Sequence, residues 1–265
     1  MPLLFSESGL QRLDEVVKPG LLCVFDFDGT LAPIVAQPEQ ACLPANIRQR
    51  LMILSDYAPV AILTGRSLAD IRMRLGFEPT YLVGNHGLEG LPGWHLQSEG
   101  YEKQSRIWKS RLENALQNKA VFDPSIWIED KRYSLSVHYR SASDHPGTIS
   151  QLMELFEKLS PVPRIVAGKC VFNLLPGNGA DKGSAFLQLM ESSSASSAIY
   201  VGDDVTDEDV FRLRRPDLLS IRVENASDTA AEFYLPHRLD VLRLLDAVIG
   251  RLARLPVNTA DSLGP

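Results

Sequence analysis

Leu22-Cys23-Val24-Phe25-Asp26-Phe27-Asp28-Gly29-Thr30-Leu31 is the stretch that decides the fold. Its apolar start, followed by turn residues, predicts a short strand buried on both faces, as in a parallel sheet. Asp26 and Asp28 would then lie at the carboxyl end of that strand, where open α/β sheets place their ligands. Two neighbouring carboxylates repel each other unless a cation or a shared proton relieves them. We therefore expect a metal ion at this strand end.

The chain has 265 residues, of which 45% are hydrophobic and 23% charged, which suits two globular domains of unequal size. Its net charge of −6 and the lack of a long basic run argue against nucleic acid or an anionic membrane as main partner. No apolar stretch approaches the ~20 residues that span a bilayer, and the N-terminus lacks a signal-peptide layout. Cys23, Cys42 and Cys170 are expected to be reduced thiols. We expect a cytoplasmic protein, with a monomer as the simplest state.

The first ninety residues alternate expected strands and helices. After an amphipathic helix over 6–17, the patterns predict strands at 22–25, 60–63 and 81–83, with helices at 45–57 and 68–75. This βαβαβ order is typical of a doubly wound parallel sheet with helices on both faces.

The pattern changes in the middle of the chain. A charged helix over 101–118, alternating strands at 127–131 and 133–139, a helix at about 147–159 and strands at 164–167 and 170–175 predict an antiparallel sheet with one wet face. The α/β pattern then returns, with helices from Lys182, at 207–213 and at 238–254 and strands at 198–201 and 219–223. We therefore expect an α/β core of residues 1–92 and 177–265, into which an α+β domain of residues 93–176 is inserted.

Three of the apolar strands run into polar residues of particular kinds. Asp26 and Asp28 follow the first strand, Thr64 follows the second, and Gly202-Asp203-Asp204 follows a later one. Because the carboxyl ends of parallel strands lie along one edge of a sheet, these side chains should gather there. Each pattern alone could be coincidence. Their joint occurrence in this order, with Lys182 between them, predicts a functional site.

These motifs resemble the haloacid dehalogenase superfamily and, more narrowly, its trehalose-6-phosphate phosphatases. The superfamily resemblance is carried by Asp26-Phe27-Asp28-Gly29-Thr30, Thr64, Lys182 and Gly202-Asp203-Asp204 with Asp207. The narrower one adds Leu63-Thr64-Gly65-Arg66, Asn85-His86-Gly87, Ser136-Val137-His138-Tyr139-Arg140, Gly168-Lys169-Cys170-Val171 and the run from Asp203 to Phe211. The resemblance covers about residues 20 to 211 and implies that the inserted domain is a cap over the catalytic core.

The resemblance implies hydrolysis of a phosphate monoester through an aspartyl-phosphate. Asp26 would be the nucleophile, and Asp28 would act as general acid and then as general base. A dianionic phosphate beside these carboxylates needs a cation, and Mg²⁺ suits such oxygen ligands. Its implied ligands are the Asp26 carboxylate, the Asp28 backbone carbonyl and Asp203, with Asp204 and Asp207 in support. Asp204 and Asp207 could instead simply cap the helix that follows them.

The resemblance also implies which groups bind the phosphoryl oxygens. Thr64 and the Gly65 backbone N–H would donate hydrogen bonds to these oxygens, and Lys182 would neutralise their charge in the transition state. Arg66 and His86 are expected to line the phosphate or the sugar side. His86 could instead donate a hydrogen bond that stabilises its own loop.

The cap is expected to close over the site, exclude water and read the sugar. The candidates that match the family's cap motifs are Glu129, Lys131, Arg140 and Lys169, although each could equally be an exposed charge on a wet sheet face. Asn173 stands where the family usually carries Glu. An amide there replaces an anionic acceptor, so the sugar is less firmly indicated than the phosphatase chemistry.

The resemblance therefore implies a Mg²⁺-dependent phosphatase that hydrolyses trehalose 6-phosphate, a small sugar phosphate. Close alternatives are a phosphatase of the sucrose-phosphate or mannosyl-phosphoglycerate type, or a mutase that passes the phosphoryl group to a sugar. A phospho-accepting signalling module is the alternative from a different class. Asp28 and the 93–176 insertion argue against it, because an acid/base group beside the nucleophile speeds the hydrolysis that a signal needs to be slow.

Overall fold

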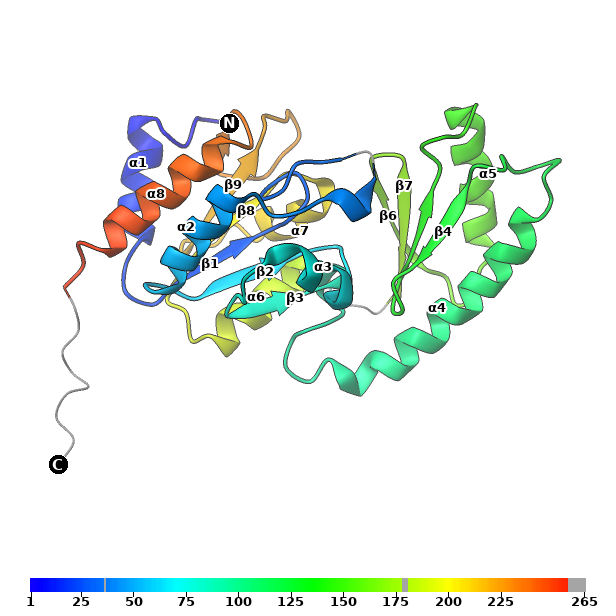
Figure 1. Cartoon of the computed structure of the whole chain (residues 1–265), viewed down its shortest axis with the longest axis horizontal. Coiled ribbons are helices and arrows are strands. Elements are labelled where there is room, and N and C mark those ends of the chain that lie inside the picture. Colours follow the sequence, from blue (N-terminus) through cyan, green and yellow to red (C-terminus); the bar gives the residue numbers. More distant parts are fainter. Residues whose placement is uncertain (36, 178–180, 257–265) are drawn as a thin grey trace.

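The computed structural model describes residues 1–35, 37–177 and 181–256 and contains two separate β-sheets. A six-stranded sheet forms the larger part, and a four-stranded sheet stands beside it with its own helices (Figure 1). This is the expected α/β architecture with a parallel sheet and an added antiparallel sheet. Within the described residues, no helix is long and apolar enough to span a membrane.

The larger sheet is parallel throughout and has the strand order β10-β9-β8-β1-β2-β3. Its strands are β1 (Leu21–Phe25), β2 (Val60–Leu63), β3 (Tyr81–Val83), β8 (Ser197–Gly202), β9 (Leu218–Val223) and β10 (Phe233–Leu235). Phe25 at the end of β1 pairs with Ile62 on β2 and with Val201 on β8. The carboxyl ends of these three strands therefore lie side by side, and the residues that follow them meet at one edge.

Both faces of this sheet are covered, as the continuous apolar strands require. One face packs on α1 (Glu7–Val16), α2 (Ala45–Ser55), α3 (Leu68–Leu75) and α8 (Asp240–Leu252), and the other packs on α6 (Lys182–Ser192) and α7 (Glu208–Phe211). Within β1, Cys23 and Phe25 face the first layer, whereas Leu22 and Val24 face the second. This alternation buries every residue of β1 and fixes the direction in which the chain leaves the strand.

The smaller sheet is antiparallel and has the strand order β4-β5-β7-β6. Its strands are β4 (Trp127–Asp130), β5 (Leu135–His138), β6 (Arg164–Gly168) and β7 (Val171–Leu175), and its helices are α4 (His95–Leu116) and α5 (His145–Glu157). Leu135, Val137 and Leu174 on one face pack with Trp108 of α4 and Phe156 of α5. Figure 1 shows both helices on the side of the sheet away from the larger domain. The other face carries polar side chains and looks toward the larger sheet.

The observed elements differ from the expected ones in three places. The short strand β10 was not predicted from the sequence. The helix predicted over 101–118 begins earlier, at His95. Its first turns are mostly polar and lack an apolar stripe, so the sequence pattern did not indicate them. The helix predicted over 207–213 is a 3₁₀ turn (Val205–Asp207) followed by the four-residue α7.

Candidate active site

The chain turns sharply after β1 and places Asp26 and Asp28 at the edge of the larger sheet. The Asp26 N–H donates to the carbonyl of Val201 at 2.9 Å, which extends the pairing with β8 by one residue. The turn is closed by the Gly29 N–H, which donates to the Ala32 carbonyl at 2.8 Å. Gly29 has φ +87°, and a Cβ there would overlap the carboxylate of Asp203. Glycine is therefore required twice, for its left-handed backbone and for the close approach of the two acidic segments.

Three carboxylates meet at this edge. Side-chain oxygens of Asp26, Asp203 and Asp207 all lie within 4.8 Å of one another. Asp203 Oδ1 accepts a hydrogen bond from Thr30 Oγ1 at 3.0 Å. The side chain of Asp204 is exposed and outside this cluster. Of the five acidic residues that were predicted together, Asp26, Asp203 and Asp207 thus form a cluster, and the side chains of Asp28 and Asp204 lie outside it.

Asp207 organises the loop that follows β8. Its Oδ2 atom accepts the backbone N–H groups of Asp203 and Asp204, each at 2.9 Å. Its Oδ1 atom accepts from the Tyr200 hydroxyl at 2.6 Å and from Lys182 Nζ at 2.8 Å. With both oxygens engaged by protein donors, Asp207 is suited to hold the loop and Lys182 in place. Asp26 and Asp203 are better placed to offer oxygens to a ligand.

Lys182 is the positive charge of the cluster. Its side chain is 2% exposed, and Nζ lies 2.8 Å from both Asp26 Oδ1 and Asp207 Oδ1. Lys182 begins α6, whose N-cap is Asp181. Although burial acts to lower the pKa of Lys182, Asp207 and Asp26 raise it above its ordinary value, so the ammonium stays charged. A cation at a helix N-terminus opposes the helix dipole, and here the two carboxylates offset that cost.

The cluster carries more negative than positive charge. Burial, with the nearby carboxylate of Asp207 and despite Lys182, raises the pKa of Asp26 to about 7. Burial and the carboxylates of Asp26 and Asp207 raise the pKa of Asp203 to about 9. A cation in addition to Lys182 would relieve the repulsion among these ionised carboxylates. Converging carboxylate oxygens are the ligands that Mg²⁺ prefers. The donor set of this chain therefore fits a hard divalent cation.

Thr64 and Gly65 follow β2 and lie next to this cluster along the sheet edge. Thr64 is buried, and its N–H donates to the carbonyl of Val83 on β3 at 3.0 Å. A Cβ on Gly65 would overlap the ring of His86. The close fit of these residues explains why glycine follows Thr64, and it brings the ring to the strand end.

Arg66 points toward Asp28. Arg66 Nε lies 2.6 Å from Asp28 Oδ2, and Arg66 Nη2 lies 2.7 Å from Asp28 Oδ1, which is a bidentate pair. The same guanidinium donates to Asp70 Oδ2 at 2.6 Å and to the Pro38 carbonyl at 2.9 Å. Arg66 was expected to line the phosphate or sugar side, and in this structure it binds the side chain of Asp28.

His86 is held in a conformation that non-glycine residues rarely adopt. Its φ is +58°, and its N–H donates to the Thr64 carbonyl at 2.9 Å. The ring is buried, and among the described residues neither ring nitrogen has a hydrogen-bond partner. Burial, followed by the charges of Lys182, Lys131 and Arg164, lowers the pKa of His86 well below its usual range. A neutral ring with unused nitrogens among three cations is suited to contact an anion.

The smaller domain reaches this site through the turn between β4 and β5. Lys131 Nζ donates to the Gly65 carbonyl at 3.1 Å. Asn85 Nδ2 donates to the Lys131 carbonyl at 3.0 Å, and Asn85 Oδ1 accepts from Ser134 Oγ at 2.6 Å. These hydrogen bonds, one of them buried and two partly buried, anchor the β4–β5 turn beside Thr64 and Gly65 and bring Lys131 into the site.

The other cap candidates contact one another across the polar sheet face. Glu129 Oε2 lies 2.9 Å from His138 Nε2, and Asn173 Oδ1 accepts from Ser136 Oγ at 2.6 Å. Arg140 donates to the Lys169 carbonyl at 3.1 Å, and both residues are exposed. The strand register places this last pair beyond His138, at the opposite end of the sheet from Lys131. The structure therefore gathers Lys131 with the acidic cluster and separates Arg140 and Lys169 from it.

Sequence reasoning missed Arg164, which joins the two domains. Arg164 begins β6, and its Nη2 lies 3.0 Å from Asp209 Oδ2 on α7. Its Nη1 lies 3.8 Å from Asp181, the residue before Lys182. An arginine at the start of a strand gives no local signal of such a contact. Thr30 and Tyr200 were also missed, although Thr30 belongs to the opening motif.

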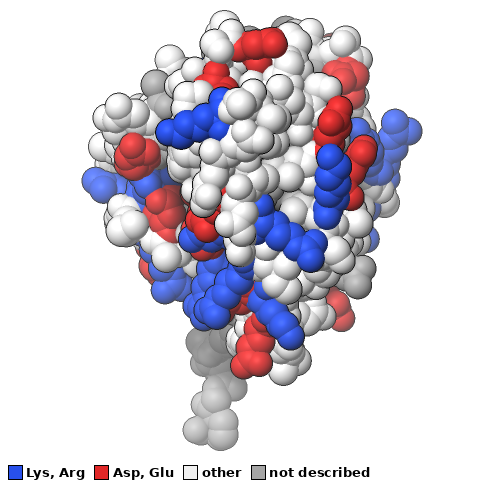
Figure 2. All heavy atoms as spheres, turned by 90° about the vertical axis from the view of Figure 1, so that its right-hand side faces the viewer, with Lys and Arg blue, Asp and Glu red and all other residues white. Residues whose placement is uncertain are grey.

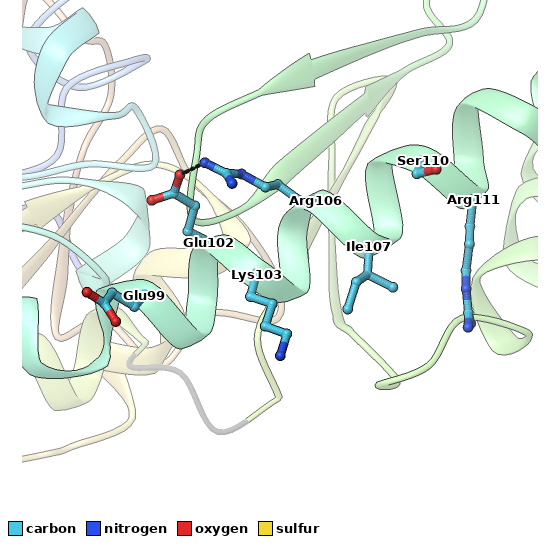
Figure 3. Close-up of a pocket in the computed structure, with 7 residues that line it drawn as sticks. All are labelled: Glu99, Glu102, Lys103, Arg106, Ile107, Ser110 and Arg111. Atoms are coloured by element: carbon cyan, nitrogen blue, oxygen red, sulfur yellow. Dashed lines mark hydrogen bonds and ion pairs between the residues drawn. The ribbon is translucent and has the colours of Figure 1, made fainter.

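A surface hollow of about 680 Å³ lies elsewhere, along α4. Figure 3 shows its lining residues, all from that helix, with Glu102 paired to Arg106. Figure 2 views the molecule from the side of the smaller sheet. It shows Lys and Arg side chains gathered over the lower half of this face, with Asp and Glu among them. None of the residues around the acidic cluster lines this hollow, so it is not part of the candidate active site.

A parallel sheet with Asp26 after its central strand, Thr64 on the next, and Lys182 and Asp203 beside them is the arrangement of the haloacid dehalogenase superfamily. Residues 24–237 match the family model described as trehalose-phosphatase, and the chain belongs to that family.

Relatives and solved structures agree with this family. The trehalose-phosphate phosphatase of Mycobacterium tuberculosis (strain H37Rv) is 32% identical over 246 residues, which are 88% of this chain and 62% of that protein. This chain thus spans about three-fifths of the length of the curated relatives that it matches. The structure of Aspergillus fumigatus trehalose-6-phosphate phosphatase has a TM-score of 0.63 at 25% identity, covering 94% of this chain and 99% of the other. The crystal structure of a trehalose-6-phosphate phosphatase related protein has a TM-score of 0.69 at 24% identity, covering 86% of this chain and 97% of the other. At this identity the similarity is evidence for the fold only.

Proposed function

We propose that this protein is a Mg²⁺-dependent phosphatase that hydrolyses trehalose 6-phosphate to trehalose and phosphate. The observation that carries this proposal is the buried contact of Asp26 with Lys182 beside Asp203, at the end of β1. Membership of the trehalose-phosphatase family supports the substrate.

Asp26 is the proposed nucleophile. A carboxylate oxygen of Asp26 attacks phosphorus, the bond from phosphorus to the sugar oxygen breaks, and an aspartyl-phosphate forms. Lys182 holds Asp26 Oδ1 at 2.8 Å, which orients the carboxylate and offsets its charge as the anionic phosphate approaches. Water then attacks phosphorus and releases phosphate from Asp26.

Asp28 is the proposed acid and base. It gives a proton to the leaving sugar oxygen, and it later takes one from the attacking water. In the structure its carboxylate is bound by Arg66 on both oxygens. Because Arg66 engages both carboxylate oxygens, Asp28 must leave Arg66 to reach the sugar oxygen. We infer that substrate binding moves the Asp28 carboxyl from Arg66 to the sugar oxygen.

The phosphoryl oxygens are assigned to groups around the strand ends. Thr64, the Gly65 N–H and His86 would donate hydrogen bonds to them, and Lys182 would supply positive charge. His86 suits this role because its ring nitrogens are unused within the described residues and cations surround it. Lys131, whose Nζ contacts the Gly65 carbonyl, would add positive charge beside these groups.

Mg²⁺ is the proposed cofactor. The residues that would hold it are Asp26, Asp203 and the backbone carbonyl of Asp28, with Asp207 and Asp204 fixing the loop around them. When bound, the cation supplies positive charge that offsets the phosphate and the carboxylates.

The segment 93–176 is the proposed cap, whose polar face covers the site and reads the sugar. Lys131 is its clearest contact, with Glu129 and Asn173 farther along the sheet, whereas Arg140 and Lys169 would need the sugar to extend to the far end. Asn173 accepts a hydrogen bond from Ser136 and stands where the family usually carries Glu. This difference favours, as a second candidate function, a phosphatase that acts on a different sugar phosphate. We also propose that the protein is a monomer and that it is located in the cytoplasm. The three free cysteines support this location.

Phosphate release from a panel of sugar phosphates, with and without Mg²⁺, tests this function. We expect the highest kcat/KM for trehalose 6-phosphate, over glucose 6-phosphate and sucrose 6-phosphate, and no turnover after chelation. Asp26→Asn should abolish turnover, while the matched surface variant Asp14→Asn should not. If a different sugar phosphate is preferred, trehalose 6-phosphate is not the substrate, but the phosphatase activity remains supported.

A further inference from the structure

Two aromatic rings stack on the polar face of the smaller sheet. The rings of Trp127 and His138 lie 4.0 Å apart with an angle of 7° between their planes. They project from directly paired positions on β4 and β5. Glu129 Oε2 lies 2.9 Å from His138 Nε2 and fixes the orientation of the imidazole. The pair is therefore a rigid flat surface held by a carboxylate.

The stacked pair contributes little to the core of its own domain. Trp127 is 49% exposed, although indole is the largest apolar side chain available for burial. The core of this domain lies on the opposite sheet face, where Trp108, Leu152 and Phe156 are fully buried. An exposed ring that is nevertheless fixed in one orientation indicates a surface prepared for a ligand.

The strand that carries Trp127 also reaches the acidic cluster. Residues 127, 129 and 131 alternate with residues that face the helices, and Lys131 Nζ contacts the Gly65 carbonyl beside Thr64. Four residues of extended strand separate Trp127 from Lys131, a distance of about 13 Å. A sugar phosphate that extends from the acidic cluster past Lys131 along this sheet face would bring its second ring toward Trp127.

We propose that Trp127, backed by His138, is a stacking surface for the sugar ring that does not carry the phosphate. The apolar C–H face of a pyranose buries well against an aromatic plane, and the hydroxyls at its rim stay free for polar groups. Trp127 is thus a specificity-determining residue that favours disaccharide phosphates over monosaccharide phosphates. This inference rests on the proposed function.

Kinetics of Trp127→Ala and Trp127→Phe test the inference, with trehalose 6-phosphate and glucose 6-phosphate as substrates. Trp127→Ala should raise KM for trehalose 6-phosphate about tenfold, with kcat nearly unchanged, because the lost contact is made equally in ground state and transition state. Kinetics with glucose 6-phosphate should not change. Trp127→Phe should recover most of the affinity, and Val121→Ala, which removes another half-exposed apolar side chain of the same domain, should behave as wild type.

Binding of trehalose itself, followed by tryptophan fluorescence, supplies a second readout. We expect trehalose to change the emission of the wild type and to leave Trp127→Phe, which keeps Trp94 and Trp108, unchanged. Equal losses on both substrates, or none, would overturn the inference and leave the proposed function intact. If the wild type shows no preference for trehalose 6-phosphate over glucose 6-phosphate, the proposed function fails and the inference falls with it.

Discussion

Arg66 binds Asp28 through two parallel hydrogen bonds of 2.6 and 2.7 Å, so the guanidinium is directed at the acid/base candidate. Arg66 is itself fixed by Asp70, which also binds Arg74 of the same helix. A chain of alternating charges therefore runs from α3 to the loop after β1. We expect this chain to set where the Asp28 carboxyl lies when the site awaits substrate.

Replacing Arg66 should harm the chemical step more than binding. Lysine offers a single ammonium and cannot form the bidentate pair, so Arg66→Lys should lower kcat about 10²-fold through misplacement of Asp28, with KM changed little. Steady-state kinetics would measure both constants. Arg50→Lys, in the surface pair with Asp246, is the matched control. An unchanged kcat for Arg66→Lys would show that Arg66 does not position Asp28.

The contact of Arg164 with Asp209 should keep the cap aligned with the core. Arg164→Met retains the aliphatic stem but loses the charge, and we expect kcat/KM to fall about tenfold by misalignment of the two domains. Unfolding free energy should change by less than about 1 kcal/mol, since the pair is partly exposed. Arg106→Met is the control within the smaller domain.

A charge swap separates alignment from simple loss of a side chain. Arg164→Asp combined with Asp209→Arg should recover part of the activity that either single change loses, as a double-mutant cycle would show. If the losses in the two single variants simply add, the ion pair does not align the domains.

Lys182 should be important for stability as well as for turnover. Lys182→Met leaves Asp26 and Asp207 buried without their cation, and breaking such a buried pair costs about 3–5 kcal/mol. The loss of unfolding free energy, measured by urea denaturation, should be smaller at pH 5 than at pH 8. At pH 5 Asp26, whose pKa is raised to about 7, can take a proton. Lys169→Met, at an exposed position, is the control. A loss independent of pH would contradict this account of the cluster.

The effect of Mg²⁺ on stability should grow with pH. Because folding raises the pKa of Asp26 to about 7 and of Asp203 to about 9, the folded protein holds these protons more tightly than the unfolded chain. The metal-free protein should therefore lose stability as pH rises from about 4 to about 9. A bound cation needs the ionised carboxylates, so the gain in melting temperature from Mg²⁺ should be larger at pH 8 than at pH 5. Equal gains at both values would argue against binding at this cluster.

Residues at strand ends could be predicted from the sequence because local pattern and sheet topology suffice to bring them together. Continuous apolar runs gave β1, β2 and β8, and parallel strands share one edge, so Asp26, Thr64 and Asp203 had to meet. The inserted antiparallel sheet was visible in the same way, through alternating polar and apolar residues.

Contacts between side chains distant in sequence could not be predicted. Arg66 and Asp28 are 38 residues apart, and Arg164 and Asp209 are 45 apart, so their pairing depends on how loops and domains pack. Stacking of Trp127 on His138 depends on strand register, which alternation alone leaves open by steps of two residues. Helix ends were misplaced where capping signals were weak, as at His95.

Trapping of the phosphoryl group shows directly whether Asp26 is the nucleophile. We would mix the enzyme with trehalose 6-phosphate labelled with ³²P and Mg²⁺, quench with acid within a turnover, and map the labelled peptide. We expect a label on Asp26 that hydroxylamine removes and that is absent from Asp26→Asn. Label on another residue, or full turnover by Asp26→Asn, would contradict this role.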